Sequence, residues 1–406
     1  MRVLHLTTEF PPVIYGGLGT AVGGLVTASP QAGIEAAVLL VGAGGDPSYR
    51  RPAAADHAVT NAADIRFVAG IHVHPVSHAD AEGYALRLIA DWQPDVLHLH
   101  VFWLWPLARA LRARTGVGIV YTVHSLDRAE YELGQGPPEC LGQWETQAEL
   151  IASADLIVAL TRSEERLIGE YCPQVSERIR VIGNGIADTA GAREAVRRRG
   201  WHDMPLILFT GRFVERKGIR EFLAAAALVL QQRPAVRFVL AGGHRHCDGA
   251  SMARYWMPEE LRGYDDRIHF TGWLTAEELT GWYRLADILA VPSWYEPFGM
   301  VVLEGMLYGL PIVASNIGGP AEILVHERTA LLVPPRDPVA LAESFVALVD
   351  APQLRRELGL AAAGAVRQEW LYGRVVQKMK TAYAESIRRR PQWTGEPAAV
   401  RVGGFA

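Results

Sequence analysis

Short apolar runs alternate with longer segments of helical periodicity along most of this chain. The runs 3–7, 36–41 and 205–210 have the length and the dense apolar content of buried strands, whereas 219–232 repeats apolar residues at helical spacing. The alternation occurs twice, on either side of a polar stretch that ends near Met204. Because consecutive parallel strands need a crossover between them, we predict two α/β domains, each with a parallel sheet covered by helices.

The same reasoning places the remaining elements. Strands are expected at 96–100, 119–125, 154–160, 180–186, 236–241, 267–272, 287–292, 311–315 and 329–333. Helices are expected at 20–26, 103–114, 146–153, 163–170, 298–309, 337–350, 352–370 and 374–389, and Thr275 with Glu278 predicts the capping box of another. We place His72 and His74 on an edge strand, and we expect loops at 42–64 and 126–144 and a disordered tail after Pro391.

Length and composition argue for a two-domain protein and against several other classes. At 406 residues the chain exceeds what one hydrophobic core usually supports. A net charge of −4 argues against a nucleic-acid-binding protein, and no apolar run reaches the roughly 18–20 residues of a membrane span. The three cysteines are not spaced like a disulfide framework or a zinc site. We therefore expect a cytoplasmic protein.

Two histidine groups invite a metal interpretation, and neither supports it. His72, His74 and His78 have no carboxylate or second cluster at ligand spacing. His244, His246 and Cys247 are too close in sequence to surround one ion easily. We expect no metal site at either place.

The most informative stretch extends from Ser293 to Glu304. It follows the apolar run 287–292, and Pro297 fits the first turn of the helix behind it. Glu296 is therefore expected in the loop at a strand's carboxyl end, and Glu304 about two turns inside the helix. Ligands of open α/β sheets bind beyond these strand ends. Two carboxylates there suit a polyhydroxylated ligand, although two solvated glutamates would give the same pattern.

Three further turns carry anion-binding features. Gly16-Gly17 follows the first strand, and Gly318-Gly319 opens a helix after the run 311–315. Free N–H groups at such helix starts bind anions, although tight packing explains glycines there about as often. Arg212 and Lys217 flank the turn after 205–210, where two cations could hold a diphosphate or simply be solvated.

These motifs together resemble those of a known enzyme family. The run 293–304, with Gly318, Gly319 and Glu322 behind it, resembles the E-x7-E signature of retaining glycosyltransferases. The chain is most similar to glycosyltransferase family four, which is related to glycogen and sucrose synthases, and the likeness covers nearly all of it. Two departures stand out: Ile14-Tyr15 replace the lysine of bacterial glycogen synthases, and the loop 242–248 is longer than in relatives.

The resemblance implies a fold and a domain division. The fold would be GT-B, with two facing Rossmann-like domains and the active site in the cleft between them. Residues 1–186 would bind the acceptor, 187–372 would bind the nucleotide-sugar donor, 373–390 would form a helix that packs back on the first domain, and 391–406 would be a flexible tail.

The resemblance also implies roles for individual residues. The donor-binding residues would be Gly16, Gly17, Arg212, Lys217, Leu274, Glu296, Phe298, Gly299, Met300 and Glu304. The catalytic residues would be His124, Glu296, Arg212 and Lys217, and His98 and His100 would lie on the acceptor side. Because Arg212 and Lys217 can stabilise a leaving diphosphate, and no Asp-x-Asp motif ends a strand, we expect no metal and no other cofactor.

The expected reaction is transfer of a hexosyl group from a UDP-, ADP- or GDP-sugar to an acceptor hydroxyl, with retention of configuration through front-face attack. A saccharide or small metabolite is the favoured acceptor, and a lipid carrier stays open. The alternatives are a sugar phosphorylase or a nucleotide-sugar 2-epimerase on the same fold, and a sugar-binding module without activity. The base, the sugar, the acceptor and the oligomeric state are not fixed by the sequence.

Overall fold

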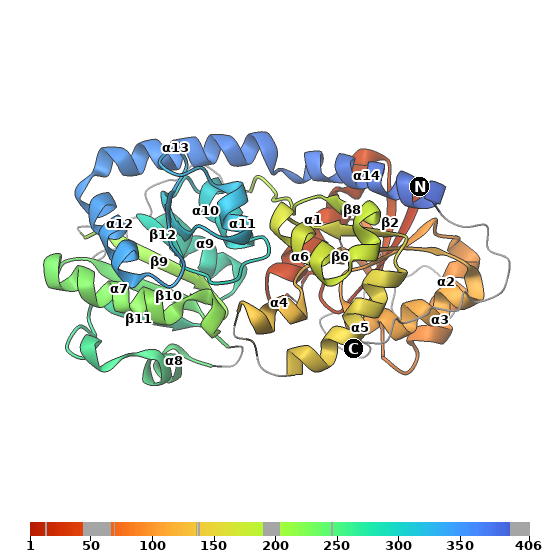
Figure 1. Cartoon of the computed structure of the whole chain (residues 1–406), viewed down its shortest axis with the longest axis horizontal. Coiled ribbons are helices and arrows are strands. Elements are labelled where there is room, and N and C mark those ends of the chain that lie inside the picture. Colours follow the sequence, from red (N-terminus) through yellow and green to blue (C-terminus); the bar gives the residue numbers. More distant parts are fainter. Residues whose placement is uncertain are drawn as a thin grey trace, which may run out of the picture.

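Two α/β lobes lie side by side in this computed structural model, each built around one sheet (Figure 1). The structure describes residues 1–12, 14–43, 66–68, 70–134, 136, 139–189, 204–244 and 247–389. The expected tail after Pro391, most of the expected loop 42–64 and His246 lie outside these residues. The predicted architecture of two successive strand-and-helix series is confirmed.

The N-terminal lobe has a sheet in the order β3-β4-β2-β1-β5-β6-β7-β8. Its neighbouring strands pair in parallel, except for the antiparallel pair β3–β4. The strands are β1 (Arg2–Thr7), β2 (Glu35–Val41), β3 (Arg66–Val68), β4 (Ile71–Val76), β5 (Val96–Leu99), β6 (Gly118–Val123), β7 (Leu156–Ala159) and β8 (Ile179–Val181).

Helices follow these strands as crossovers. They are α1 (Gly17–Ala28), α2 (Ala81–Trp92), α3 (Trp105–Thr115), α4 (Asp127–Glu132), α5 (Glu139–Ser153) and α6 (Arg162–Tyr171), with 3-10 turns η1 (Ser29–Ala32), η3 (Phe102–Leu104) and η4 (Pro173–Arg178). Alternation along β1 directs Leu4 and Leu6 into one core cluster and Val3 into another on the opposite face.

The C-terminal lobe has an all-parallel sheet in the order β11-β10-β9-β12-β13-β14. Its strands are β9 (Leu206–Gly211), β10 (Arg237–Gly242), β11 (Ile268–Gly272), β12 (Ile288–Val291), β13 (Ile312–Ser315) and β14 (Leu331–Val333). Its helices are α7 (Ile219–Gln232), α8 (Gly249–Trp256), α9 (Ala276–Leu285), α10 (Met300–Leu307), α11 (Gly318–Ile323), α12 (Pro338–Asp350) and α13 (Pro352–Glu369), with 3-10 turns η5 (Glu215–Lys217) and η6 (Glu259–Leu261). The predicted capping box at Thr275 and Glu278 starts α9.

The last helix, α14 (Tyr372–Arg389), leaves the C-terminal lobe and lies on the N-terminal lobe, where the blue ribbon in Figure 1 runs beside α1. Tyr372 donates a hydrogen bond to the carbonyl of Thr20 at 3.1 Å. A Cβ on Gly24 would lie 2.0 Å from the Tyr372 ring, so only glycine allows this close packing. The expected return of the terminal helix is confirmed.

Three sequence expectations about elements were wrong. The expected loop 126–144 contains α4 and the first part of α5. The strand with His72 and His74 is not an edge strand, because β3 pairs outside it. The strand expected at 180–186 ends at Val181, because Gly183 and Gly185 approach Trp370 and Tyr372 too closely to continue a regular ladder.

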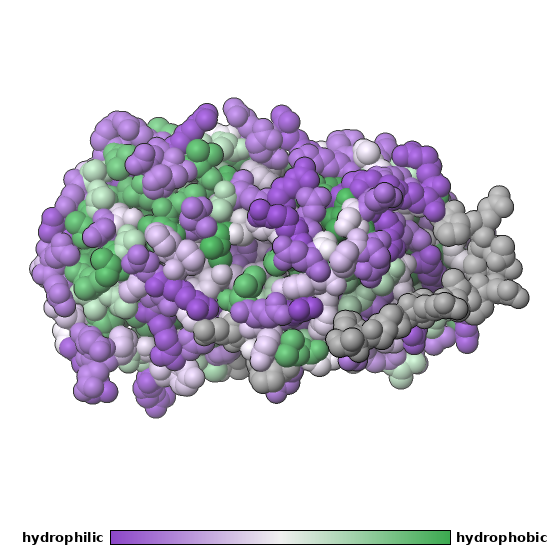
Figure 2. Space-filling model, in the orientation of Figure 1, coloured by the Kyte–Doolittle hydropathy of each residue, from purple (hydrophilic) through white to green (hydrophobic). Residues whose placement is uncertain are grey.

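Polar side chains cover much of the face drawn in Figure 2, with apolar residues more frequent over the C-terminal lobe on the left. Among the described residues, no helix combines the length and the apolar character that a membrane crossing requires.

Candidate active site

The order of strands reverses between β9 and β12 in the C-terminal lobe, and the loops after these two strands lie together there. Such a reversal opens a crevice at the carboxyl ends of the strands, where ligands bind in open α/β sheets. Gly218 has a φ of 73°, and a Cβ on it would lie 2.0 Å from the carbonyl oxygen of Pro292. The glycine thus lets the loop that carries Lys217 contact the loop that carries Glu296.

Lys217 and Glu296 form a hydrogen-bonded ion pair at this crevice. Their side chains are only 18% and 8% exposed, and Ser293 Oγ lies 3.3 Å from the same carboxylate oxygen. Burial alone would raise the pKa of Glu296, but the neighbouring charges of Lys217 and Arg216 bring it below its usual value. Glu296 is therefore ionised at neutral pH, while burial lowers the pKa of Lys217 and the carboxylate of Glu296 opposes that change.

Arg212 is the cation of this crevice that has no fixed partner. Its side chain is exposed, and it forms neither a hydrogen bond nor an ion pair with the residues that the structure describes. The carboxylates of Glu9 and Glu296 are among the charges close enough to influence it. Since Glu9 belongs to the N-terminal lobe, Arg212 faces the opening between the lobes with its guanidinium available to a ligand.

Glu304 lies little more than one turn inside α10, nearer the helix start than expected. Its Oε2 accepts a hydrogen bond from Tyr283 Oη at 2.5 Å, and the same hydroxyl lies 3.1 Å from Thr210 Oγ1. Burial raises the pKa of Glu304. Tyr283 thus fixes one carboxylate oxygen of Glu304 and leaves the other for a ligand.

The glycine turn of the N-terminal lobe meets the start of α10. A Cβ on Gly17 would lie 3.4 Å from the Met300 side chain, and no atom lies within 4 Å of such a Cβ on Gly16. Gly299 caps α10 with a φ of 97°, and Phe298 beside it packs against Trp370. Two N-terminal helix ends therefore approach each other across the lobes. Leu274, expected near the base, is half-buried against the same apolar cluster as Met300.

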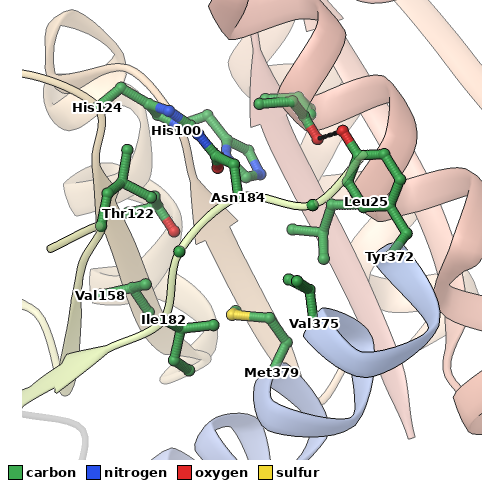
Figure 3. Close-up of a pocket in the computed structure, with 15 residues that line it drawn as sticks. Leu25, His100, Thr122, His124, Val158, Ile182, Asn184, Tyr372, Val375 and Met379 are labelled. Carbon is green, nitrogen blue, oxygen red and sulfur yellow. Dashed lines mark hydrogen bonds between the residues drawn. The ribbon is translucent and has the colours of Figure 1, made fainter. Parts of the chain in front are cut away.

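His124 follows β6 and lines a narrow crevice together with residues 183–185. Its Nε2 lies 3.2 Å from Nδ1 of His100, and Figure 3 shows Asn184 pointing toward these two rings. Burial lowers the pKa of His124 to about 4, so the ring is neutral at physiological pH.

His98 and His100, expected on the acceptor side, point to one face of β5 as alternation requires, and both are buried. His98 is fully enclosed between Tyr383 Oη and Thr122 Oγ1, each 2.7 Å away. The ring of His98 therefore holds β5, β6 and α14 together.

His5, His98 and His100 are close enough to suggest a metal site, which the sequence had not indicated. Both ring nitrogens of His98 and of His100 already have hydrogen-bond partners. Only Nε2 of His5 lacks a partner. A metal ion would have to break these hydrogen bonds, so the donor set does not fit a resident metal.

The turn Gly318-Gly319 is not the free anion cradle that its sequence suggests. The N–H of Gly319 donates to the carbonyl of Glu296 at 2.9 Å, and a Cβ there would lie 1.8 Å from the carbonyl oxygen of Phe298. These glycines bring β13 and its turn against the Glu296 loop. Glu322 accepts hydrogen bonds at 2.7 Å from the N–H groups of Arg162 and Ser163, so it joins the two lobes.

Several residues of the site were missed by sequence reasoning. They are Tyr283, which binds Glu304, and the interlobe contacts of Glu130, Glu164, Arg216 and Tyr295. Arg216 and Tyr295 carried a signal, because they stand next to Lys217 and Glu296.

Comparisons with known proteins agree with this geometry. The family models described as "Glycosyltransferase Family 4" and "Glycosyl transferases group 1" match residues 15–189 and 204–351. The chain is 32% identical over 330 residues to a D-inositol 3-phosphate glycosyltransferase of Acidothermus cellulolyticus, covering 76% of this chain and 71% of that protein. The chain belongs to glycosyltransferase family 4.

Other known proteins resemble this chain over a greater length. A glycogen synthase of Mycobacterium tuberculosis is 29% identical over 411 residues, covering 97% of each chain. The catalytic domain of starch synthase IV from Arabidopsis thaliana, solved with ADP and acarbose, superimposes with a TM-score of 0.71 at 16% identity, covering 95% of this chain and 99% of that one. The GT-B fold that the sequence predicted is confirmed for this family 4 glycosyltransferase.

Proposed function

We propose that the protein transfers a hexosyl group from a nucleotide diphosphate sugar to an acceptor hydroxyl, with retention of configuration and without a metal ion. One observation carries this proposal. The ion pair Lys217–Glu296 and the unpaired Arg212 gather at the strand-order reversal of one lobe, and the glycine turn of the other lobe contacts Met300 beside them.

The two cations and the helix start of α1 form the diphosphate site. Arg212 and Lys217 neutralise the charge that develops on the leaving diphosphate, which is the role a metal ion has in other transferases. The exposed turn at Gly16 and Gly17 lets the N–H groups of α1 approach a phosphate closely.

The carboxylates bind the hydroxyl groups of the donor. Glu304, with one oxygen fixed by Tyr283, accepts hydrogen bonds from the ribose, and Leu274 lies against the base. Glu296, with Gly299 and Met300 behind it, holds hydroxyls of the transferred sugar. Because Lys217 keeps Glu296 ionised, the carboxylate acts as an acceptor only.

In the proposed reaction the acceptor hydroxyl attacks the anomeric carbon from the face that the diphosphate leaves. The bond between that carbon and the phosphate oxygen breaks, a bond to the acceptor oxygen forms, and the leaving phosphate takes the acceptor's proton. His124 hydrogen-bonds the transferred sugar. Its neutral ring does not oppose the positive charge of the oxocarbenium-like transition state.

The acceptor is a saccharide or a small hydroxylated metabolite in this proposal. Two relatives named above support these two classes: the glycogen synthase by its name suggests a saccharide acceptor, and the D-inositol 3-phosphate glycosyltransferase suggests a small metabolite. UDP, ADP and GDP are the candidate donor nucleotides, and the starch synthase was solved with ADP.

A thermal-shift panel with UDP, ADP, GDP and their sugars tests donor binding. A ligand that binds only the folded state at about 100 times its Kd stabilises by about 2.7 kcal/mol. We expect one nucleotide family to raise the Tm, and we expect this shift to disappear in Arg212→Ala and Glu304→Ala. Arg233→Ala is the control, since Arg233 is exposed and paired with Asp350.

Product analysis separates the remaining alternatives. Anomeric retention and full activity in EDTA, observed by NMR of the product, support the proposal. Conversion of the nucleotide sugar without an acceptor indicates an epimerase. Cleavage of a glycoside by phosphate, without any nucleotide, indicates a phosphorylase. Binding without any product indicates a sugar-binding module.

A further inference from the structure

Three histidine rings form one hydrogen-bonded line from the interior of the N-terminal lobe to the cleft. His5 Nδ1 lies 2.9 Å from His100 Nε2, and His100 Nδ1 lies 3.2 Å from His124 Nε2. The planes of the His5 and His100 rings are inclined by only 12°, with centroids 5.3 Å apart. Figure 3 shows the outer part of this line, where His100 and His124 stand next to each other.

The line follows from strand alternation and register. His5 on β1 pairs with His98 on β5, and His100 lies two residues further along the same face. His5 has no exposed surface and His100 has 3%. Burial lowers the pKa of both rings, and that of His124, so all three are neutral at physiological pH.

The hydrogen bonds between these neutral histidines couple their tautomers. Each contact needs one N–H and one bare nitrogen, and each neutral ring has one of each. If His5 carries its proton on Nδ1, then His100 and His124 must do the same. If His5 carries it on Nε2, all three carry it on Nε2.

The buried end of the line selects between these two states. Nε2 of His5 is buried and has no hydrogen-bond partner among the residues that the structure describes. In the Nε2–H state this atom would be an orphaned buried N–H, which is rare in proteins. The Nδ1–H state buries only a bare ring nitrogen there.

We propose that His5 and His100 are positioning residues that hold His124 as the neutral Nδ1–H tautomer. His124 Nδ1 has no partner among the described residues, so its N–H becomes a hydrogen-bond donor for a cleft ligand. The inference rests on the proposed function, because the ligand would be the transferred sugar. A neutral N–H donor binds a sugar oxygen without adding charge beside the oxocarbenium-like state.

His98 also faces this line but does not join it. His98 lies over His100 with ring centroids 4.1 Å apart, but its nitrogens contact Tyr383 and Thr122 instead. Burial lowers the pKa of His98 as well. Tyr383→Phe therefore disturbs the same buried cluster without touching the line.

The tautomer can be read directly from the 15N chemical shifts of selectively labelled histidines, with the His124 signals assigned by their loss in His124→Asn. We expect the Nδ1–H pattern for His124 in the unmodified protein. His100→Phe removes both hydrogen bonds and should produce a mixture of tautomers at His124. His100→Asn keeps a donor at the Nδ1 position and should restore the Nδ1–H pattern, while Tyr383→Phe should leave it unchanged.

Kinetics provide the second measurement. We expect His100→Phe to lower kcat by about 10- to 100-fold with little change in donor KM, by analogy with the loss when a group that orients a metal-ligating histidine is removed. His100→Asn should recover most of this loss. An Nε2–H pattern in the unmodified protein, or an unchanged pattern in His100→Phe, would overturn the inference. The spectra can be recorded without turnover. If they show the expected tautomers but the protein has no transferase activity, the proposed function is refuted and the proposal about the tautomer of His124 is not.

Discussion

Arg216 of the C-terminal lobe reaches Glu130 of the N-terminal lobe, with 2.7 Å between Nε and Oε1. The Arg216 side chain is only 8% exposed and also lies near the ring of Tyr295. The next residue, Lys217, is paired with Glu296. The contact that joins the lobes and the cation of the proposed diphosphate site are therefore consecutive in the chain, so a change in lobe closure would also move Lys217.

Glu130→Ala should open the lobes. Removing one partner of a buried ion pair leaves the other uncompensated, at a cost of about 3–5 kcal/mol when the pair is fully buried. We expect a larger radius of gyration in small-angle scattering and a kcat/KM reduced by about tenfold or more. Glu149→Ala removes an exposed pair with Arg109 and is the control. An unchanged radius with lower activity would show that Glu130 acts on the site and not on closure.

Tyr283→Phe should weaken donor binding. The change deletes the hydroxyl that fixes Glu304, and a hydrogen bond to a charged group contributes about 1.5–3 kcal/mol. We expect the nucleotide Kd, measured by calorimetry, to rise by about tenfold or more. Tyr308→Phe is the matched control, because Tyr308 stacks on the same ring but its hydroxyl faces Thr280. Equal effects of both changes would contradict the role of Tyr283.

Lys217→Met should destabilise the protein more than the double variant Lys217→Met/Glu296→Gln. The single change leaves a buried carboxylate without its cation, whereas the double change removes both charges. Urea denaturation of the two single variants and the double variant gives the coupling free energy. Additive effects would mean that the two side chains do not form the ion pair in solution.

Glu164→Gln should change the pH dependence of stability. Burial raises the pKa of Glu164 to about 8, and Tyr295 Oη lies 3.3 Å from its carboxylate. Between about pH 4.5 and 8 the folded state keeps a proton that the unfolded state has lost, so the free energy of unfolding falls as pH rises, by at most about 1.4 kcal/mol per pH unit.

The variant should therefore match the unmodified protein near pH 4.5 and exceed it in stability near pH 8. The difference between the two proteins at each pH isolates Glu164 from the buried histidines, which titrate with the opposite sign. Glu165→Gln, on the next and more exposed residue, should show no such trend. A difference that does not depend on pH would contradict the raised pKa.

The sequence predicted the fold because its signal is local. Apolar runs and helical periodicity marked nearly every strand and most helices, although α2, α4 and α8 were not predicted. The Glu296 and Lys217 loops follow strands whose ends were clear. Tyr283 was not predictable, since an aromatic residue in an amphipathic helix gives the same pattern whether it packs in the core or binds Glu304. Gly319 was wrongly predicted to bind an anion, because a glycine required by a close backbone contact gives the same sequence pattern as a glycine that contacts a ligand.

The line of histidines was also not predictable from the sequence. His98 and His100 were noticed from their spacing, but His5 sits in a first strand that otherwise reads as plain core. Only the parallel register of β1 with β5 brings His5 to the other rings. Contacts between residues 95 positions apart leave no trace in the pattern of a single sequence.

The position of α14 has a consequence for how this protein is made. Its residues Val376 and Met379 share an apolar cluster with Val3 and Val120, so the first lobe is completed by a helix that is translated after the whole C-terminal lobe. While the ribosome is still adding the C-terminal lobe, one face of the earlier sheet stays uncovered. The apolar face of the N-terminal sheet is therefore accessible to chaperones until Tyr372–Arg389 has been translated and packs on it.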